Sequence, residues 1–196
     1  TAGGGIMLTL LTLLLGAHLA TASLADSTQT LSGVTMPDTV TVNGTQLVLN
    51  GMALRKKMVF KVYVAGLYLP ARNSDPDAIL GADAARQIVL HFLRGVDKGK
   101  MCDAWEESLK NNSPDASADV KEKFTTLCSY MDDVDKDQQM IFTYLPDQGT
   151  SIEVNGVAKG TLEGKEFADA LFRSWIGPKP GPGEDFKKKL LGQKKD

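Results

Sequence analysis

The chain has 196 residues, and its 22 lysine and arginine residues nearly balance its 24 aspartate and glutamate residues, for a formal net charge of −2 at pH 7. This balance, without a basic stripe that carries interleaved aromatic residues, argues against a nucleic-acid partner. The sequence holds no G-x-S-x-G, H-E-x-x-H or phosphate-loop motif, which excludes the hydrolase classes that those motifs mark. The acidic run Asp132–Asp137 lacks the central Gly and the closing Glu of a calcium loop, so no metal site is predicted.

The N-terminal segment is predicted to be a signal peptide. Its apolar run, Ile6–Ala17, is too short to span a bilayer, and small residues follow with candidate cleavage sites at Ala20–Ala22 and Ser23–Ala25. This order of segments is typical of secretory signals, although no Lys or Arg precedes the run. We therefore expect residues 1–25 to be removed, the protein to be exported to the periplasm, and no stable membrane span. The alternative is a buried N-terminal helix.

The remaining chain, 26–196, is roughly 170 residues long, which fits one domain with one core. We see no internal repeat, and no domain boundary precedes the Pro- and Gly-rich segment at Gly177–Gly183. The sequence therefore predicts a single domain in which residues 177–196 form a tail rich in Pro, Gly and Lys.

The first half of this domain is rich in β-strand signals. Alternating apolar residues on both sides of Asn43-Gly44 predict a hairpin, because Asn-Gly suits a tight turn between strands. Longer strand-like runs follow at Val59–Leu69 and Gln87–Leu93. Between them, Ser74-Asp75-Pro76 is typical of the start of a short helix.

After Gly99 the apolar period changes from two to about 3.6, which predicts two amphipathic helices separated by Asn111–Pro114. Strand signals return at Gln139–Leu145 and Ser151–Val154, with a weaker one at Val157–Thr161. A last helix ends at Gly177-Pro178. The predicted apolar helix faces are Met101, Trp105 and Leu109, then Val120, Phe124, Leu127, Cys128 and Met131, then Phe167, Leu171, Phe172 and Trp175. This order of elements indicates an α+β fold with helices on one face of a mostly antiparallel sheet.

The only two cysteines, Cys102 and Cys128, fall on the two neighbouring helices. An antiparallel pair of helices could bring them within bridging distance, and an exported protein can hold such a disulfide. Two buried free thiols are the alternative.

Three segments carry a family resemblance: Gly51-x-x-x-Arg55 at the start of a strand, the run Phe60–Leu69, and the distant run Gly164–Gly177. With them the chain resembles the chalcone isomerase family, and within it the non-catalytic, fatty-acid-binding branch, from about Val34 to Leu191. The resemblance implies an open-faced β-sandwich, in which a large sheet is covered by helices with a cleft between them.

Arg55 and Tyr63 are the main candidates for binding a ligand. On one straight strand they would lie about 26 Å apart, so they converge only if the chain turns between them. The family resemblance implies such a hairpin, with both groups facing one carboxylate at the cleft. A guanidinium and a phenol hydroxyl suit that head group. The alternative is that Arg55 pairs with an internal acid and Tyr63 only packs.

The resemblance also allows an enzyme, a chalcone isomerase that closes a ring by intramolecular addition. In that family a Tyr, an Asn and a Ser or Thr orient substrate and water, and our alignment puts Met101, Ser108 and Ser174 at these positions. Only Ser174 is compatible, because methionine has no hydroxyl to polarise a carbonyl. We therefore predict no catalytic residues, and assign Met101, Trp105, Ser108 and Ser174 to the wall of the cleft.

Two further alternatives remain open. His91, the only histidine in 26–196, could be the axial ligand of haem or another flat cofactor, although a lone strand histidine is more often an ordinary side chain. We expect Leu90 and Phe92 to face away from it, and predict no cofactor. The open face of the sheet could instead dock a protein partner.

Overall fold

The computed structural model describes Thr1 and residues 27–193, so the predicted signal peptide lies, apart from Thr1, outside the described residues. Within that part, no helix is long and apolar enough to cross a membrane. The described elements are β1 (Thr28–Leu31), β2 (Val34–Pro37), β3 (Thr39–Val42), β4 (Thr45–Lys57), β5 (Phe60–Leu69), α1 (Pro76–Gly81), β6 (Arg86–Phe92), α2 (Lys98–Asn112), α3 (Ala118–Tyr130), β7 (Gln139–Leu145), β8 (Gly149–Val154), β9 (Val157–Leu162), α4 (Lys165–Ile176) and α5 (Glu184–Leu190).

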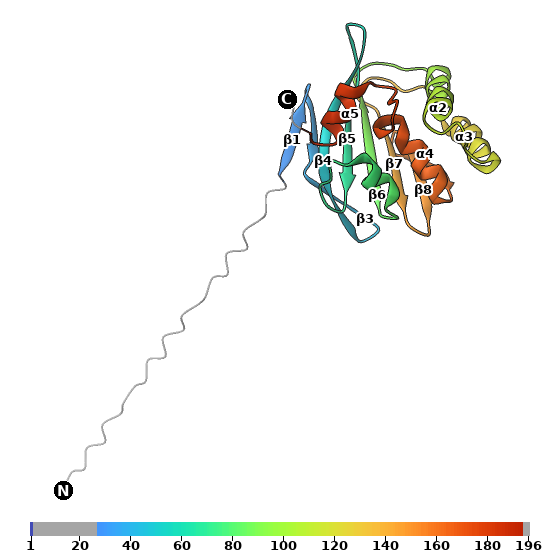
Figure 1. The fold of residues 1–196 in the computed structure, drawn as a ribbon. Coiled ribbons are helices and arrows are strands. Elements are labelled where there is room, and N and C mark those ends of the chain that lie inside the picture. The colour runs from blue at the N-terminus through green and yellow to red at the C-terminus, as the bar shows by residue number, and fades with distance from the viewer. Residues whose placement is uncertain (2–26, 194–196) are drawn as a thin grey trace.

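One antiparallel sheet organises the molecule. Its seven strands, β3 to β9, each pair with the next strand along the chain. The helices lie on one face of this sheet, and the separate hairpin β1–β2 lies at its β4 side (Figure 1). The predicted α+β fold, a mostly antiparallel sheet with helices on one face, is confirmed.

The alternation of side chains along the strands builds two apolar clusters. On β5, Ala65 and Leu67 belong to the large cluster beneath the helices, whereas Val64 and Tyr68 belong to a smaller cluster on the opposite face. That second cluster includes Met36 from β2, so the β1–β2 hairpin covers part of the face that carries no helices. Period-two alternation therefore gives both faces of the sheet an apolar core.

Asn-Gly turns join two of the strand pairs. Asn43 and Gly44 have φ angles of 46° and 78°, and Asn155 and Gly156 have φ angles of 50° and 75°. Positive φ at both central residues defines the tight turn that matches the twist of a hairpin, and Asn and Gly adopt it readily. The hairpin predicted at Asn43-Gly44 is confirmed by the antiparallel pairing of β3 with β4.

The described part of the Pro-, Gly- and Lys-rich C-terminal segment, residues 177–193, packs against the domain. They contain α5, and Phe186, Leu190 and Leu191 are buried in the large cluster. The helix ends directly against β4, where Asn50 Nδ2 donates to the Leu190 carbonyl at 2.9 Å. A Cβ atom built on Gly51 would lie 2.2 Å from the Lys189 carbonyl oxygen, so only glycine permits this approach.

The enclosed cation of the fold is Arg86, which the sequence analysis did not single out. Its side chain is 1% exposed and is paired with the Asp169 carboxylate, which also accepts from Lys165 Nζ at 2.6 Å. The guanidinium lies over the rings of Tyr144 and Phe172, at 4.8 and 4.9 Å from their centroids. This network ties α4 to β6, and the pairing compensates the burial of a permanent charge.

Removal of the Asp169 carboxylate should therefore destabilise the fold strongly. We expect Asp169→Ala to lower the free energy of unfolding by about 3–5 kcal/mol, because Arg86 would be left buried without its anion. Urea denaturation measures the loss. The matched control is Asp119→Ala, which removes the exposed Asp119–Lys123 pair and should cost less than about 1 kcal/mol. Equal losses in the two variants would contradict this assignment.

Cys102 on α2 and Cys128 on α3 are joined by a disulfide, with their Cα atoms 5.4 Å apart. The bridge closes a segment with a sequence separation of 26 residues and ties the start of α2 to the end of α3. A disulfide of this kind persists in an oxidising compartment.

Thiol titration of the native protein without reductant should detect no free cysteine. Reduction should lower the free energy of unfolding by about 3 kcal/mol, because the open chain regains the entropy of that loop. The double variant Cys102→Ser/Cys128→Ser should have the same free energy of unfolding as the reduced protein, and reductant should not change it. Two free thiols in the native protein would refute the bridge.

Candidate functional site

The β4–β5 hairpin brings Arg55 and Tyr63 together. The chain turns at Met58 and Val59, and Arg55 on β4 lies directly opposite Tyr63 on β5. Arg55 follows Ala53 at a spacing of two residues, and Tyr63 precedes Ala65 in the same way, so both side chains are on the helix-covered face with these buried alanines. The short turn at Met58 and Val59 is therefore sufficient to bring Arg55 and Tyr63 opposite each other.

The phenol of Tyr63 lies in an aromatic environment. Its hydroxyl oxygen accepts a hydrogen bond from Trp175 Nε1 on α4 at 3.2 Å. Its ring packs edge to face on Phe92 of β6 and Phe186 of α5, with centroids 5.6 and 6.0 Å apart. Burial raises the pKa of Tyr63 to about 12, although the hydrogen bond from Trp175 and the charge of Arg55 oppose the rise. Tyr63 is therefore a neutral hydrogen-bond donor at physiological pH.

Arg55 is half-buried, and within the described part of the chain no acidic side chain forms an ion pair with it. The local sequence explains this, because no Asp or Glu occurs between Thr39 and Ser74. Arg86 differs from Arg55, because Arg86 is paired with Asp169, whereas Arg55 lies opposite the phenol of Tyr63. The fold therefore supplies Arg55 with no acidic partner among the described residues.

A cluster of aromatic side chains packs beside Tyr63 on the helix-covered face of the sheet. Trp175 packs against Trp105 of α2, with centroids 5.5 Å apart, and both tryptophans contact Phe142 of β7. Within the described residues Trp105 Nε1 is buried without a hydrogen-bond partner. Met101 lies one turn before Trp105 on the same helix and is also buried. Trp105 is therefore linked to Tyr63 indirectly, because it packs on Trp175, whose indole nitrogen donates to the Tyr63 hydroxyl.

The two predicted serines form a separate polar contact. Ser108 on α2 and Ser174 on α4 share a hydrogen bond at 2.7 Å between their hydroxyl oxygens. Asn112 Nδ2 donates to the Ser108 carbonyl at 3.2 Å and to the Lys179 carbonyl at 2.9 Å. These contacts fasten α2 to α4 and to the segment before α5. The serine pair therefore has partners within the protein.

Sequence reasoning missed the roles of two residues. Trp175 was predicted on the apolar face of the last helix without a polar role, yet its indole nitrogen is the hydrogen-bond partner of Tyr63. Asn112 was expected only in a connecting segment, and it joins α2 to the segment before α5 through two hydrogen bonds with Lys179. The signal that could have revealed Trp175 is its position one residue after Ser174, in the Gly164–Gly177 segment that carries the family resemblance.

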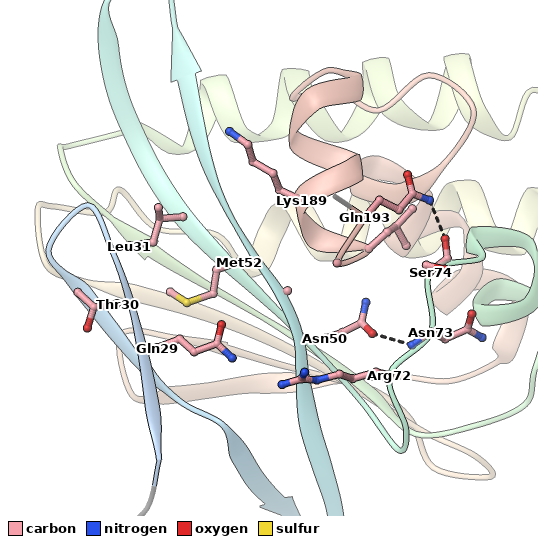
Figure 2. Close-up of a pocket in the computed structure, with 13 residues that line it drawn as sticks. Gln29, Thr30, Leu31, Asn50, Met52, Arg72, Asn73, Ser74, Lys189 and Gln193 are labelled. Atoms are coloured by element: carbon pink, nitrogen blue, oxygen red, sulfur yellow. Dashed lines mark hydrogen bonds between the residues drawn. The ribbon is translucent and has the colours of Figure 1, made fainter. Parts of the chain in front are cut away.

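Two hollows of the described surface lie away from Arg55. One, of about 580 Å³, lies between β1, β4 and the end of α5, and its lining includes Arg72 and Lys189 (Figure 2). The other, of about 790 Å³, lies between α1, α4 and the connection from α2 to α3. None of the six predicted ligand-binding residues lines either hollow.

His91 has polar neighbours on the face of the sheet without helices. Its Nδ1 lies 3.2 Å from Gln139 Nε2, and its Nε2 lies 3.6 Å from an Asp137 carboxylate oxygen. Leu90 and Phe92 point to the opposite, helix-covered side, as expected. Over the described ranges no group of three or more His, Cys, Asp or Glu side chains is arranged to hold a metal ion.

The buried phenol should make the protein sensitive to alkali. Because the pKa of Tyr63 is about 12 in the folded chain and near 10 when unfolded, the unfolded state loses its proton first. This contribution to stability is complete below pH 10 and is lost as the pH rises towards 12. We expect Tyr63→Phe to show a shallower fall of the free energy of unfolding across this window. Parallel curves for variant and wild type would contradict the shift.

The comparisons with known proteins agree with this architecture. A family model described as chalcone isomerase-like matches residues 28–192. A fatty-acid-binding protein of Arabidopsis thaliana has a similar solved structure, with a TM-score of 0.67 and 15% sequence identity, over 84% of this chain and 96% of that one. Among curated proteins, none matches the chain. Because the family model covers nearly all of the described residues, this chain belongs to the chalcone isomerase-like family.

Proposed function

We propose that this protein binds a fatty acid, or a similar small apolar carboxylate, between its sheet and its helices and catalyses no reaction. The observation that carries the proposal is the half-buried Arg55, which has no acidic partner among the described residues and lies opposite the neutral donor Tyr63. The likeness to a fatty-acid-binding protein supports the class of ligand.

The head group would be held by two complementary contacts. The planar guanidinium of Arg55 can donate two parallel hydrogen bonds to a carboxylate. Tyr63 can donate a third, because its hydroxyl keeps its proton and its oxygen already accepts from Trp175. A neutral alcohol head group would gain much less from Arg55, so the pair selects for an anion.

The acyl tail would supply most of the affinity. Burial of each methylene contributes about 0.8 kcal/mol, so a twelve-carbon chain gains on the order of 9 kcal/mol before the costs of binding. The charge-assisted contact adds about 1.5–3 kcal/mol and fixes the orientation of the ligand. Trp105, Trp175 and Phe142 pack on one another beside Tyr63, and we propose that these rings rearrange around the tail.

Isomerase chemistry is supported less well by the same geometry. Met101 is a buried thioether without a hydroxyl. Ser108 and Ser174, the other two residues aligned with the isomerase positions, are hydrogen-bonded to each other. A substrate or water would have to break this contact before either hydroxyl could orient it. Binding without turnover is therefore the function that we propose.

Binding of laurate to the delipidated protein tests the proposal. The chain contains only two tryptophans, Trp105 and Trp175, and both lie at the site, so intrinsic fluorescence should report binding directly. We expect Arg55→Ala to weaken laurate binding by roughly 10- to 100-fold, through the loss of the charged contact. Tyr63→Phe should weaken binding by a smaller factor.

Two controls locate the contact with the carboxylate. Dodecanol, which has the same tail and no charge, should bind wild type and Arg55→Ala equally. Arg72→Ala removes an exposed cation beside the hollow of Figure 2 and should leave laurate affinity unchanged. Equal laurate binding by wild type and Arg55→Ala, or a selective loss in Arg72→Ala, would refute the proposed site.

A further inference from the structure

The tip of the β4–β5 hairpin exposes apolar side chains to solvent. Met58, Val59 and Phe60 are 89%, 84% and 54% exposed, and within the described residues Val157 is the one other large hydrophobic residue exposed to this degree. The hairpin projects beyond the neighbouring strands, at the top of Figure 1. Three consecutive exposed apolar residues at a projecting end are unlike the scattered single residues that are normal on protein surfaces.

Basic residues surround this tip. Lys56 and Lys57 precede it on β4 and Lys61 follows it on β5, and all three are exposed. Across the described residues none of these lysines forms an ion pair. The Arg94 guanidinium lies over the Phe60 ring, 4.6 Å from its centroid. In a chain with a net charge of −2, this end of the molecule is locally cationic and apolar.

The backbone of the turn indicates that its side chains have a role beyond folding. Met58 has a φ of 56°, a conformation that is uncommon for a residue other than glycine or asparagine. Two other hairpins of the same sheet turn at Asn-Gly, at Asn43-Gly44 and Asn155-Gly156. A methionine followed by a valine is therefore a poor choice for the turn alone, and strain of this kind accompanies function.

We propose that the hairpin tip, Lys56–Lys61, docks onto an anionic lipid bilayer. Met58 and Val59 enter the boundary between head groups and acyl chains, while the lysines contact the phosphates. A bilayer fits this surface better than a protein partner does, because a stable protein interface buries about 800 Å² on each side and a two-residue turn presents far less. The proposal does not depend on ligand binding, although Arg55 adjoins this tip.

Co-sedimentation with vesicles tests the docking. Wild-type protein should bind phosphatidylcholine vesicles that contain about 30 mol% phosphatidylglycerol, bind pure phosphatidylcholine at least about tenfold more weakly, and be released by high salt. Lys56→Gln/Lys57→Gln should weaken binding about fivefold for each lysine removed. Met58→Gly/Val59→Ser should weaken it about tenfold or more.

Matched controls separate docking from general effects. Val157→Ser removes a single exposed valine at another hairpin, and Lys110→Gln/Lys121→Gln removes two exposed helix lysines. Both variants should bind as wild type does. Met58→Gly alone should retain or raise the melting temperature, because glycine suits the φ of that turn. Laurate affinity should be unchanged in the hairpin variants, which keeps the failure of either proposal distinguishable.

Several results would overturn the proposal. The first is a failure of the wild-type protein to bind the anionic vesicles. The second is a loss of binding in the Val157→Ser control as large as that in Met58→Gly/Val59→Ser. Binding that depends on the lysines but survives Met58→Gly/Val59→Ser would indicate a charged partner in place of a bilayer. A concentration-dependent dimer that the hairpin variants abolish would indicate that the tip contacts a second copy of the chain.

Discussion

The pairing of β4 with β5 is the constraint on which the rest of the site depends. A register irregularity between Arg55 and Lys56 separates this pair from the two-residue turn, and a slip of one residue would move Arg55 to the other face of the sheet. With this register Arg55 lies opposite Tyr63, Tyr63 reaches Trp175 on α4, and its ring packs on Phe186 of α5. One hairpin thus aligns a cation, a hydroxyl and the two helices that close over them.

The two partly or fully enclosed arginines show how the fold treats permanent charge. Arg86 is removed from water and is neutralised by Asp169, because an unpaired charge in that position would be costly. Arg55 keeps partial contact with solvent, so water can stabilise its charge when no ligand is present. This difference lets Arg55 remain without an internal anion, which the proposed carboxylate contact requires.

The elements that rest on local signals were predicted well, and the long-range contacts were not. Asn43-Gly44 identifies its own hairpin, and the resemblance carried by Gly51–Leu69 supplies a topology that periodicity alone would not. The partner of Arg86 lies 83 residues away and that of Tyr63 lies 112 residues away, and no local pattern encodes such distances. The helix α5 was missed because Phe186 and Leu190, its buried face, stand among lysines in a segment rich in Pro and Gly.

The close contact at Gly51 gives a physical meaning to the spacing Gly-x-x-x-Arg. A side chain at Gly51 would collide with the carbonyl oxygens of Lys189 and Leu190 and would push the C-terminal helix away from the strand. That helix carries Phe186, which rests on Tyr63. The absence of a side chain at Gly51 therefore determines how closely α5 packs against β4, the strand that carries Arg55 four residues later.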